Sequence, residues 1–174
     1  MDKKTVELSN CFDVVKKRER VIVVGIRNDI YKEKGDFVFP EKPNKNNWIP
    51  LSVAVPKLAI EEKKYYFSER AVQGMKNAKN NMKRGLAQNL NEPCLTVTSH
   101  LAKVSLNSRD PVLLVNSEKE LYRRFTPREA ARIQSFPDTF EFVGSEAAAY
   151  RQIGNAIPPV MFWYIMNAVE KYLG

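Results

Sequence analysis

The pattern of hydrophobic and polar positions divides the chain into three unequal pieces. In the first, residues 1–30, polar and apolar side chains alternate from Thr5 to Leu8, and residues 21–26 form an almost unbroken β-branched run. Alternation is typical of a half-buried strand, and a run that is apolar on both faces is typical of a strand covered on both sides. Thirty residues cannot supply that cover. The sequence therefore predicts a strand pair that packs against polypeptide from outside this piece.

The second piece, residues 31–121, is polar, irregular and basic. Its segment 35–50 is rich in Lys, Asn and Pro and predicts a loop, whereas 68–82 predicts a helix. Partial alternation over 94–106 predicts a pair of strands, and 112–115 predicts another short strand. A long segment with this little regular structure is usually functional.

The third piece, residues 122–174, is the most regular. Thr126 and Glu129 form a capping box with proline between them, which predicts a helix that ends before Phe136. A second short helix is expected at about 146–152.

The last helix is predicted from the Pro158–Pro159 pair to about Leu173. Apolar side chains surround it almost completely. Such a helix must be buried or docked on a large surface.

Composition narrows the classes of protein without naming a function. The chain has 174 residues, 28 basic and 20 acidic, for a net charge of +8, and 44% are hydrophobic. These values fit a globular protein with a polyanionic partner and exclude general disorder. The apolar stretch 156–166 contains two prolines and is far shorter than the roughly 20 residues of a membrane span. Cys11, Cys94 and one histidine make neither a disulfide framework nor a Cys/His zinc site, and a cytoplasmic location is expected.

Four stretches, taken in order, resemble the C-terminal half of the bacterial cytosine-C5 DNA methyltransferases. They are 17–27 (KRERVIVVGIR), the basic region 31–121, 123–138 (RRFTPREAARIQSFPD) and 150–159 (YRQIGNAIPP). Three of these are similar to the family's eighth, ninth and tenth motifs, and the basic region lies where its target-recognition region does. The resemblance implies an α/β fold, with a strand pair and terminal helices from the catalytic domain. A small irregular α+β recognition domain would complete it.

The sequence also departs from the family. Residues 13–16 read DVVK where Gly-Val-Pro-Gln is usual, and nothing resembles the Gly-rich cofactor loop, the Pro-Cys-Gln nucleophile or the Glu-Asn-Val motif. Cys94 follows a proline but precedes Leu95, within the recognition region, so we expect it to be a packing residue. The resemblance therefore implies a hetero-oligomer with a chain that carries the missing motifs.

Two arginines are the candidate catalytic residues by this resemblance. Arg20 would reach O2 of a cytosine flipped out of the duplex, and Arg18 would support the site through DNA or nearby acidic groups. Residues two apart on a strand project from the same face. The alternative is a solvated charge run at the start of a strand.

Asn155 and Ile157 match positions that contact S-adenosylmethionine in the family. The resemblance implies contacts from the Asn155 side chain and the Ile157 backbone to the amino-acid end of the cofactor. Gly154 and Asn155 also predict a helix stop with left-handed backbone, which is compatible with that role. No metal is expected.

The recognition region is expected to bind double-stranded DNA. From 61 to 88 it has seven basic and three acidic residues, a charge that grips phosphates. Thr96 and Val97 resemble the family's Thr-aliphatic doublet, and Ser99, His100 and Lys103 are candidates for base or phosphate contacts. His100 is otherwise interpreted as a structural histidine.

These observations lead to one expected function and two rivals. The chain is expected to be the small subunit or C-terminal part of a cytosine-C5 methyltransferase from a restriction-modification system. It would recognise DNA and complete the cofactor pocket. The first rival is an inactive DNA-binding remnant or an accessory specificity subunit. The second, an RNA-binding protein, rests on charge alone, since the aromatic signatures of common RNA modules are missing from the sequence.

Overall fold

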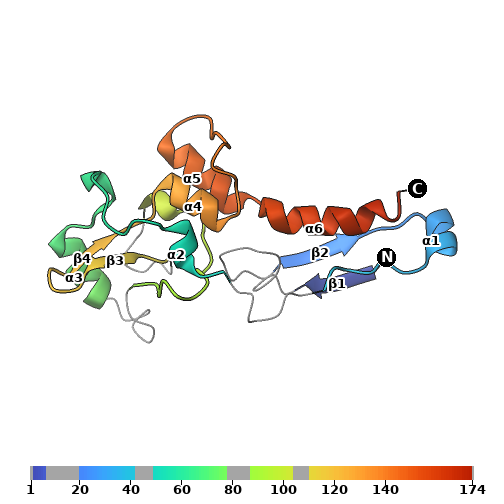
Figure 1. Cartoon of the computed structure of the whole chain (residues 1–174), viewed down its shortest axis with the longest axis horizontal. Helices are drawn as coiled ribbons and strands as arrows, with labels where there is room; N and C mark the ends of the chain where they lie inside the picture. Colours follow the sequence, from blue (N-terminus) through green and yellow to red (C-terminus); the bar gives the residue numbers. More distant parts are fainter. Residues whose placement is uncertain (1, 7–19, 42–48, 78–86, 104–109, 174) are drawn as a thin grey trace.

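The chain forms two lobes along its longest axis, as the computed structural model shows in Figure 1. The structure describes residues 2–6, 20–41, 49–77, 87–103 and 110–173. One lobe, called here the hairpin lobe, contains the first strands, helix α1 and the last helix. The other, called the core lobe, contains everything described from residue 49 to residue 155.

The hairpin lobe begins with the two strands that the sequence predicts. Strand β1 (Asp2–Val6) pairs antiparallel with β2 (Arg20–Val24), with Asp2 opposite Val24 and Val6 opposite Arg20. Helix α1 (Asn28–Lys34) follows and ends at Gly35, where a φ of 74° permits the turn.

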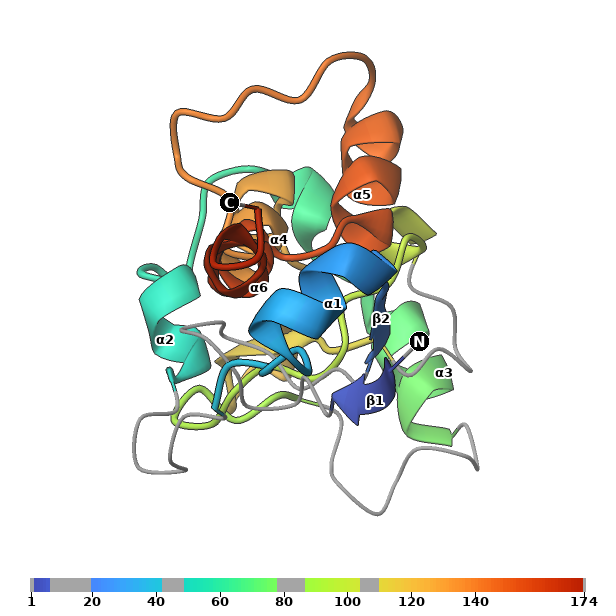
Figure 2. The same ribbon diagram turned by 90° about the vertical axis from the view of Figure 1, so that its right-hand side faces the viewer.

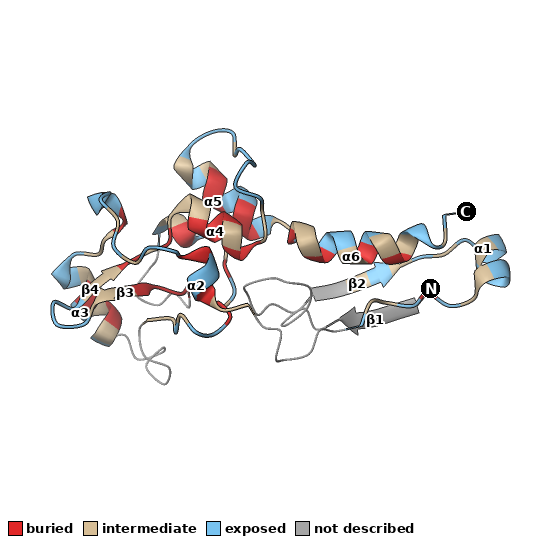
Figure 3. Cartoon of the chain, in the orientation of Figure 1, coloured by how far each residue is buried: buried red, intermediate tan, exposed pale blue. Residues whose placement is uncertain are grey.

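Helix α6 (Pro159–Glu170) lies along this hairpin, as Figures 1 and 2 show from two directions. Met161 and Ile165 are buried against Ile22 and Phe39. The opposite side carries apolar side chains in solvent, and Figure 3 shows it as exposed. Trp163 is 58% exposed, and Phe162 and Met166 are also exposed. The helix is therefore apolar nearly all round, as predicted, but the described part of the chain buries just one of its sides.

The core lobe is built on helices α4 (Pro127–Ile133) and α5 (Glu146–Asn155). Around them lie α2 (Leu51–Ala54), α3 (Glu69–Asn77), the 3-10 turns Lys63–Tyr65 and Leu101–Lys103, and strands β3 (Leu113–Asn116) and β4 (Leu121–Arg123). The strands β3 and β4 form an antiparallel pair. One continuous core joins residues from 51 to 153, so α4 and α5 pack with residues of the basic region 31–121.

The predicted strand pair at 94–106 is wrong for residues 95–103, whereas Cys94 takes part in a β-bridge. Residues 95–98 lack regular structure, and Leu101–Lys103 is a 3-10 turn. The partial alternation arises because Val97 and Leu101 both turn into the core. The predicted helix at 68–82 is confirmed by α3 over its described part, and the strand at 112–115 is confirmed by β3.

The predicted capping box at the start of α4 is confirmed. The Thr126 hydroxyl accepts a hydrogen bond from the Glu129 amide at 3.2 Å, and the Glu129 carboxylate accepts one from the Thr126 amide at 2.8 Å. Farther along α4, Arg132 pairs with the Asp138 carboxylate at 2.7 Å. Arg128 instead donates to the carbonyl oxygen of Phe140 at 3.0 Å.

A buried arginine connects three segments of the core lobe. Arg123 has no exposed surface and donates two hydrogen bonds to the Glu129 carboxylate, at 2.8 and 2.7 Å. Its other N–H groups donate to the carbonyl oxygens of Lys57, Leu58 and Arg124. All five guanidinium donors are therefore used, which is what burial of this group requires.

Among the described helices, none is both long and apolar enough to cross a membrane.

Arg123→Leu is expected to lower the free energy of unfolding by about 3–5 kcal/mol, because Glu129 would remain buried without its cation. Urea titration followed by circular dichroism measures this loss. Arg27→Leu is the matched control, since the Arg27–Asp29 pair is exposed and should leave the midpoint almost unchanged. Equal effects from both substitutions would contradict the role given to Arg123.

The exposed side of α6 predicts self-association of the isolated chain. Sedimentation velocity is expected to show species heavier than the 20.0 kDa monomer. The double substitution Phe162→Gln with Trp163→Gln should shift the distribution toward monomer. Val53→Gln, at an exposed position of α2 in the core lobe, should not. A stable, monodisperse wild-type monomer would contradict this prediction.

Candidate functional site

The end of α5 carries the two residues predicted to contact a cofactor. The helix continues through Gly154 to Asn155, and extended backbone begins at Ala156. Among the described residues, positive φ angles occur at Gly35, Glu120, Ser135 and Gly144. The prediction of left-handed backbone at Gly154 and Asn155 is therefore wrong, and the glycine needs another explanation.

That explanation is the close approach of another backbone. A Cβ atom at position 154 would lie 2.3 Å from the Ser99 amide nitrogen and 2.4 Å from the Thr98 carbonyl carbon. Carbon atoms are not tolerated at such distances from main-chain atoms, which cannot rotate away. Glycine therefore allows the last turn of α5 to rest directly on residues 98–99.

The turn after Gly154 presents polar and main-chain groups to solvent. Asn155 is exposed, and Ile157 is 53% exposed. A carboxamide offers both donors and an acceptor, so it suits the ammonium and carboxylate of an amino-acid group. These residues fit the role that the resemblance to the methyltransferases implies for them at the amino-acid end of S-adenosylmethionine.

Residues 96–103, called here the recognition segment, are held in shape by side-chain hydrogen bonds. The Thr98 hydroxyl donates to the Asp110 carboxylate at 2.7 Å and accepts from the His100 amide at 3.1 Å. The Ser99 hydroxyl lies 3.4 Å from Nδ1 of His100, and the Lys103 amide donates to the His100 carbonyl oxygen at 2.8 Å. This segment is therefore an ordered surface feature.

The structure separates the predicted DNA-binding residues into two groups. Thr96, His100 and Lys103 are exposed and Ser99 is half-buried, so their side chains are accessible to a ligand. Val97 has no exposed surface and packs in the core, which leaves its side chain unable to contact DNA in this conformation. Val97 therefore anchors the recognition segment from below.

The buried thiol of Cys94 lies in the same core, as expected for a packing residue. Cys11 is outside the described residues.

Of the predicted catalytic arginines, Arg20 begins β2 and Arg18 lies outside the described residues. In Figure 1, β2 and α6 both begin at the end of the hairpin lobe nearest the core lobe. The start of β2 and the connection from α5 to α6 thus lie at the same end of the hairpin lobe.

The contacts that fix α5 were not predicted. The Gln134 side chain donates to the carbonyl oxygen of Ile153 at 2.8 Å, and the Tyr150 hydroxyl donates to the carbonyl oxygen of Phe125 at 2.5 Å. Burial raises the pKa of Tyr150 well above its usual range, so the hydroxyl keeps its proton. Both residues lie in the motif-like stretches, but their partners are distant in sequence and could not be read from spacing.

The other end of α5 is anchored by charge. Glu146 accepts hydrogen bonds from Lys64 and, at 3.0 Å, from the Tyr65 hydroxyl. Burial raises the pKa of Glu146, but these two hydrogen bonds, together with the positive charges of Lys64 and Arg124, hold the pKa below its ordinary value. The ionised carboxylate therefore ties α5 to the turn at residues 63–65.

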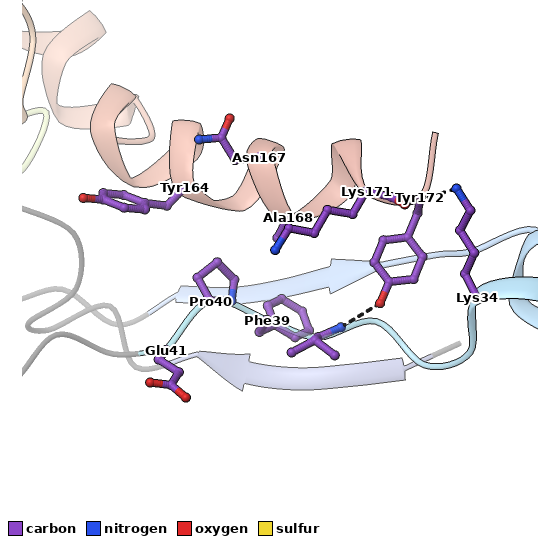
Figure 4. A pocket seen from close by; sticks show the side chains of 10 residues that line it. Lys34, Phe39, Pro40, Glu41, Tyr164, Asn167, Ala168, Lys171 and Tyr172 are labelled. Atoms are coloured by element: carbon purple, nitrogen blue, oxygen red, sulfur yellow. Dashed lines mark hydrogen bonds between the residues drawn. The ribbon is translucent and has the colours of Figure 1, made fainter. Parts of the chain in front are cut away.

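A hollow of about 820 Å³ opens between α6 and residues 38–41, and Figure 4 shows its lining. The Tyr172 hydroxyl donates to the Asp36 carbonyl oxygen at 2.7 Å and accepts from the Val38 amide at 3.3 Å. The Lys34 ammonium donates to the Lys171 carbonyl oxygen at 3.2 Å. Of the predicted site residues that the structure describes, none lines this hollow, and its described lining belongs to the hairpin lobe.

Comparison with known proteins identifies a matching family model, similar sequences and a similar solved structure. A family model described as C-5 cytosine-specific DNA methylase matches residues 4–171. The chain is 36% identical, over 93% of its length, to Type II methyltransferase M.Sau96I of Staphylococcus aureus. It is 27% identical, over 97% of its length, to Type II methyltransferase M.FnuDI of Fusobacterium nucleatum. It covers 41% and 55% of those two relatives, about half of their length.

Among solved structures, the Dnmt2 methyltransferase of S. pombe is similar, with a TM-score of 0.58 and 16% identity. The match covers 90% of this chain and 50% of that one. At this identity the likeness concerns the fold, which is an α/β methyltransferase fold.

Proposed function

The chain belongs to the family of C-5 cytosine-specific DNA methylases, and on this premise we propose that it supplies target recognition and completes the cofactor pocket of such an enzyme. The reaction is methyl transfer from S-adenosylmethionine to a cytosine flipped out of double-stranded DNA. Its setting would be a restriction-modification system.

One observation carries this proposal: the contact of Gly154 with the backbone of Thr98 and Ser99. It brings the turn proposed for the cofactor next to the segment proposed for DNA. An enzyme that transfers a group between two bound molecules must hold both in fixed relation. An inactive DNA-binding remnant has no need of such a contact.

The remaining motifs are proposed to come from a complementary polypeptide. The chain spans about half the length of the curated relatives, and no Pro-Cys-Gln triplet occurs in its sequence. The exposed side of α6 and the 47% exposed Val23 on β2 offer apolar surface for that polypeptide. Together the two would form one catalytic unit.

The residues of this chain then divide the work. Thr96, Ser99, His100 and Lys103 contact base edges or phosphates, with the basic residues around them adding salt-dependent affinity. Arg20 stabilises the negative charge that develops on the cytosine ring, and Arg18 supports it. Asn155 and the Ile157 backbone hold the amino-acid end of S-adenosylmethionine, which supplies the methyl group.

Methyl transfer from labelled S-adenosylmethionine to mixed-sequence duplex DNA is the direct test. This chain alone is expected to transfer nothing, and a mixture with a polypeptide carrying the cofactor loop and Pro-Cys-Gln motifs is expected to be active. Transfer by this chain alone would contradict the proposal. Failure of the mixture, with duplex binding retained, would favour the DNA-binding remnant.

Two substitutions separate the roles within an active mixture. Arg20→Ala should lower kcat by about 10²–10³-fold with little effect on the KM for S-adenosylmethionine, the loss typical of a group that stabilises transition-state charge. Asn155→Ala should raise that KM about tenfold, the effect of losing one hydrogen bond to a charged group. Steady-state kinetics with saturating DNA measures both. Arg20→Ala that left kcat intact would indicate a merely solvated charge run.

A further inference from the structure

We propose that Gly154 is a positioning residue that couples cofactor binding to DNA binding, an inference that rests on the proposed function. The coupling would pass through the backbone of Thr98 and Ser99. The ligands concerned are the amino-acid end of S-adenosylmethionine or its product at 155–157, and a DNA duplex at the recognition segment.

The space between the two backbones at this contact is too small for a side chain at position 154. The three nearest atoms to a Cβ at position 154, at 2.3–2.5 Å, are all main-chain atoms of Thr98 and Ser99. Trimming the side chain of residue 98 or 99 would therefore make no room. Any displacement of the α5 terminus must move the recognition segment, and the reverse also holds.

Both sides of the contact are rigid. On the α5 side, the buried Gln134 amide holds the carbonyl oxygen of Ile153 at 2.8 Å, one residue before the glycine. On the other side, the Thr98 hydroxyl bridges the Asp110 carboxylate and the His100 amide. Val97 anchors the segment in the core. Rigid elements in direct contact transmit a shift, whereas mobile ones absorb it.

Exposed residues lie close to this contact on both sides of it. Asn155 follows the glycine directly, and His100 and Lys103 follow the contacted backbone within a few residues. A ligand that shifts 155–157 into its bound position moves the recognition segment with it, so a second ligand meets a segment that is already in place. By linkage, each ligand then strengthens the other by the same factor.

The experiment uses the active complex of this chain with its complementary polypeptide. Fluorescence anisotropy gives the dissociation constant of a duplex that the complex methylates, with and without saturating S-adenosylhomocysteine. For wild type, we expect this product to tighten duplex binding at least about fivefold, the lower range of measured couplings. For Gly154→Ala, the tightening should fall below about twofold, because the added methyl separates the two backbones.

Three further variants control for folding. Gly25→Ala makes the same chemical change where a Cβ would meet nothing within 4 Å, and it should retain the coupling. Thr98→Val removes the hydroxyl that shapes the segment and should lose the coupling, whereas Thr98→Ser keeps that hydroxyl and should retain it. If Gly154→Ala does not melt cooperatively, the Thr98 pair decides the question.

The outcomes distinguish this inference from the proposed function. A complex that methylates DNA but shows equal coupling in wild type and folded Gly154→Ala, or no coupling in wild type, contradicts the inference alone. Unchanged coupling in Thr98→Val contradicts it as well. A complex that neither binds S-adenosylhomocysteine nor methylates DNA contradicts the proposed function, and the inference falls with it.

Discussion

The buried guanidinium of Arg123 sets the frame on which the core lobe is built. A charge without exposed surface must find a partner for each of its five N–H groups, and here they come from the Glu129 carboxylate and from main-chain carbonyl groups at residues 57, 58 and 124. Satisfying them fixes β4, the start of α4 and the loop at 57–58 in one arrangement. Glu129 serves twice, since it also completes the cap of α4.

Helix α5 inherits its position from that frame. Gln134 and Tyr150 attach it to α4 and to Phe125, and Glu146 attaches its first turn to residues 63–65. Its last turn then meets the backbone at 98–99, where only glycine fits. The spacing between the proposed cofactor turn and the recognition segment thus follows from core packing.

The hairpin lobe differs from the core lobe because it leaves apolar surface exposed to solvent. Among the described residues, Ile22 of β2 and Phe39 help to bury one side of α6, and apolar residues such as Trp163 on its other side remain in solvent. An exposed apolar surface of this kind is typical of an interface. The chain also spans about half the length of the relatives it matches. The core lobe is therefore held together by its own packing, whereas the hairpin lobe exposes a surface suited to assembly with another polypeptide.

Local signals in the sequence determined several features of this protein. The Thr126–Glu129 capping box, the strand pair at the N-terminus and the all-round apolar last helix are local patterns, and the structure contains each of them. The ordered motif-like stretches sufficed to identify the family. The tertiary structure alone decided why residue 154 is glycine, that Val97 lies inside and that Arg123 pairs with Glu129 without solvent. These facts depend on contacts between segments far apart in sequence, which form only when the chain folds. Local residue spacing therefore does not predict them.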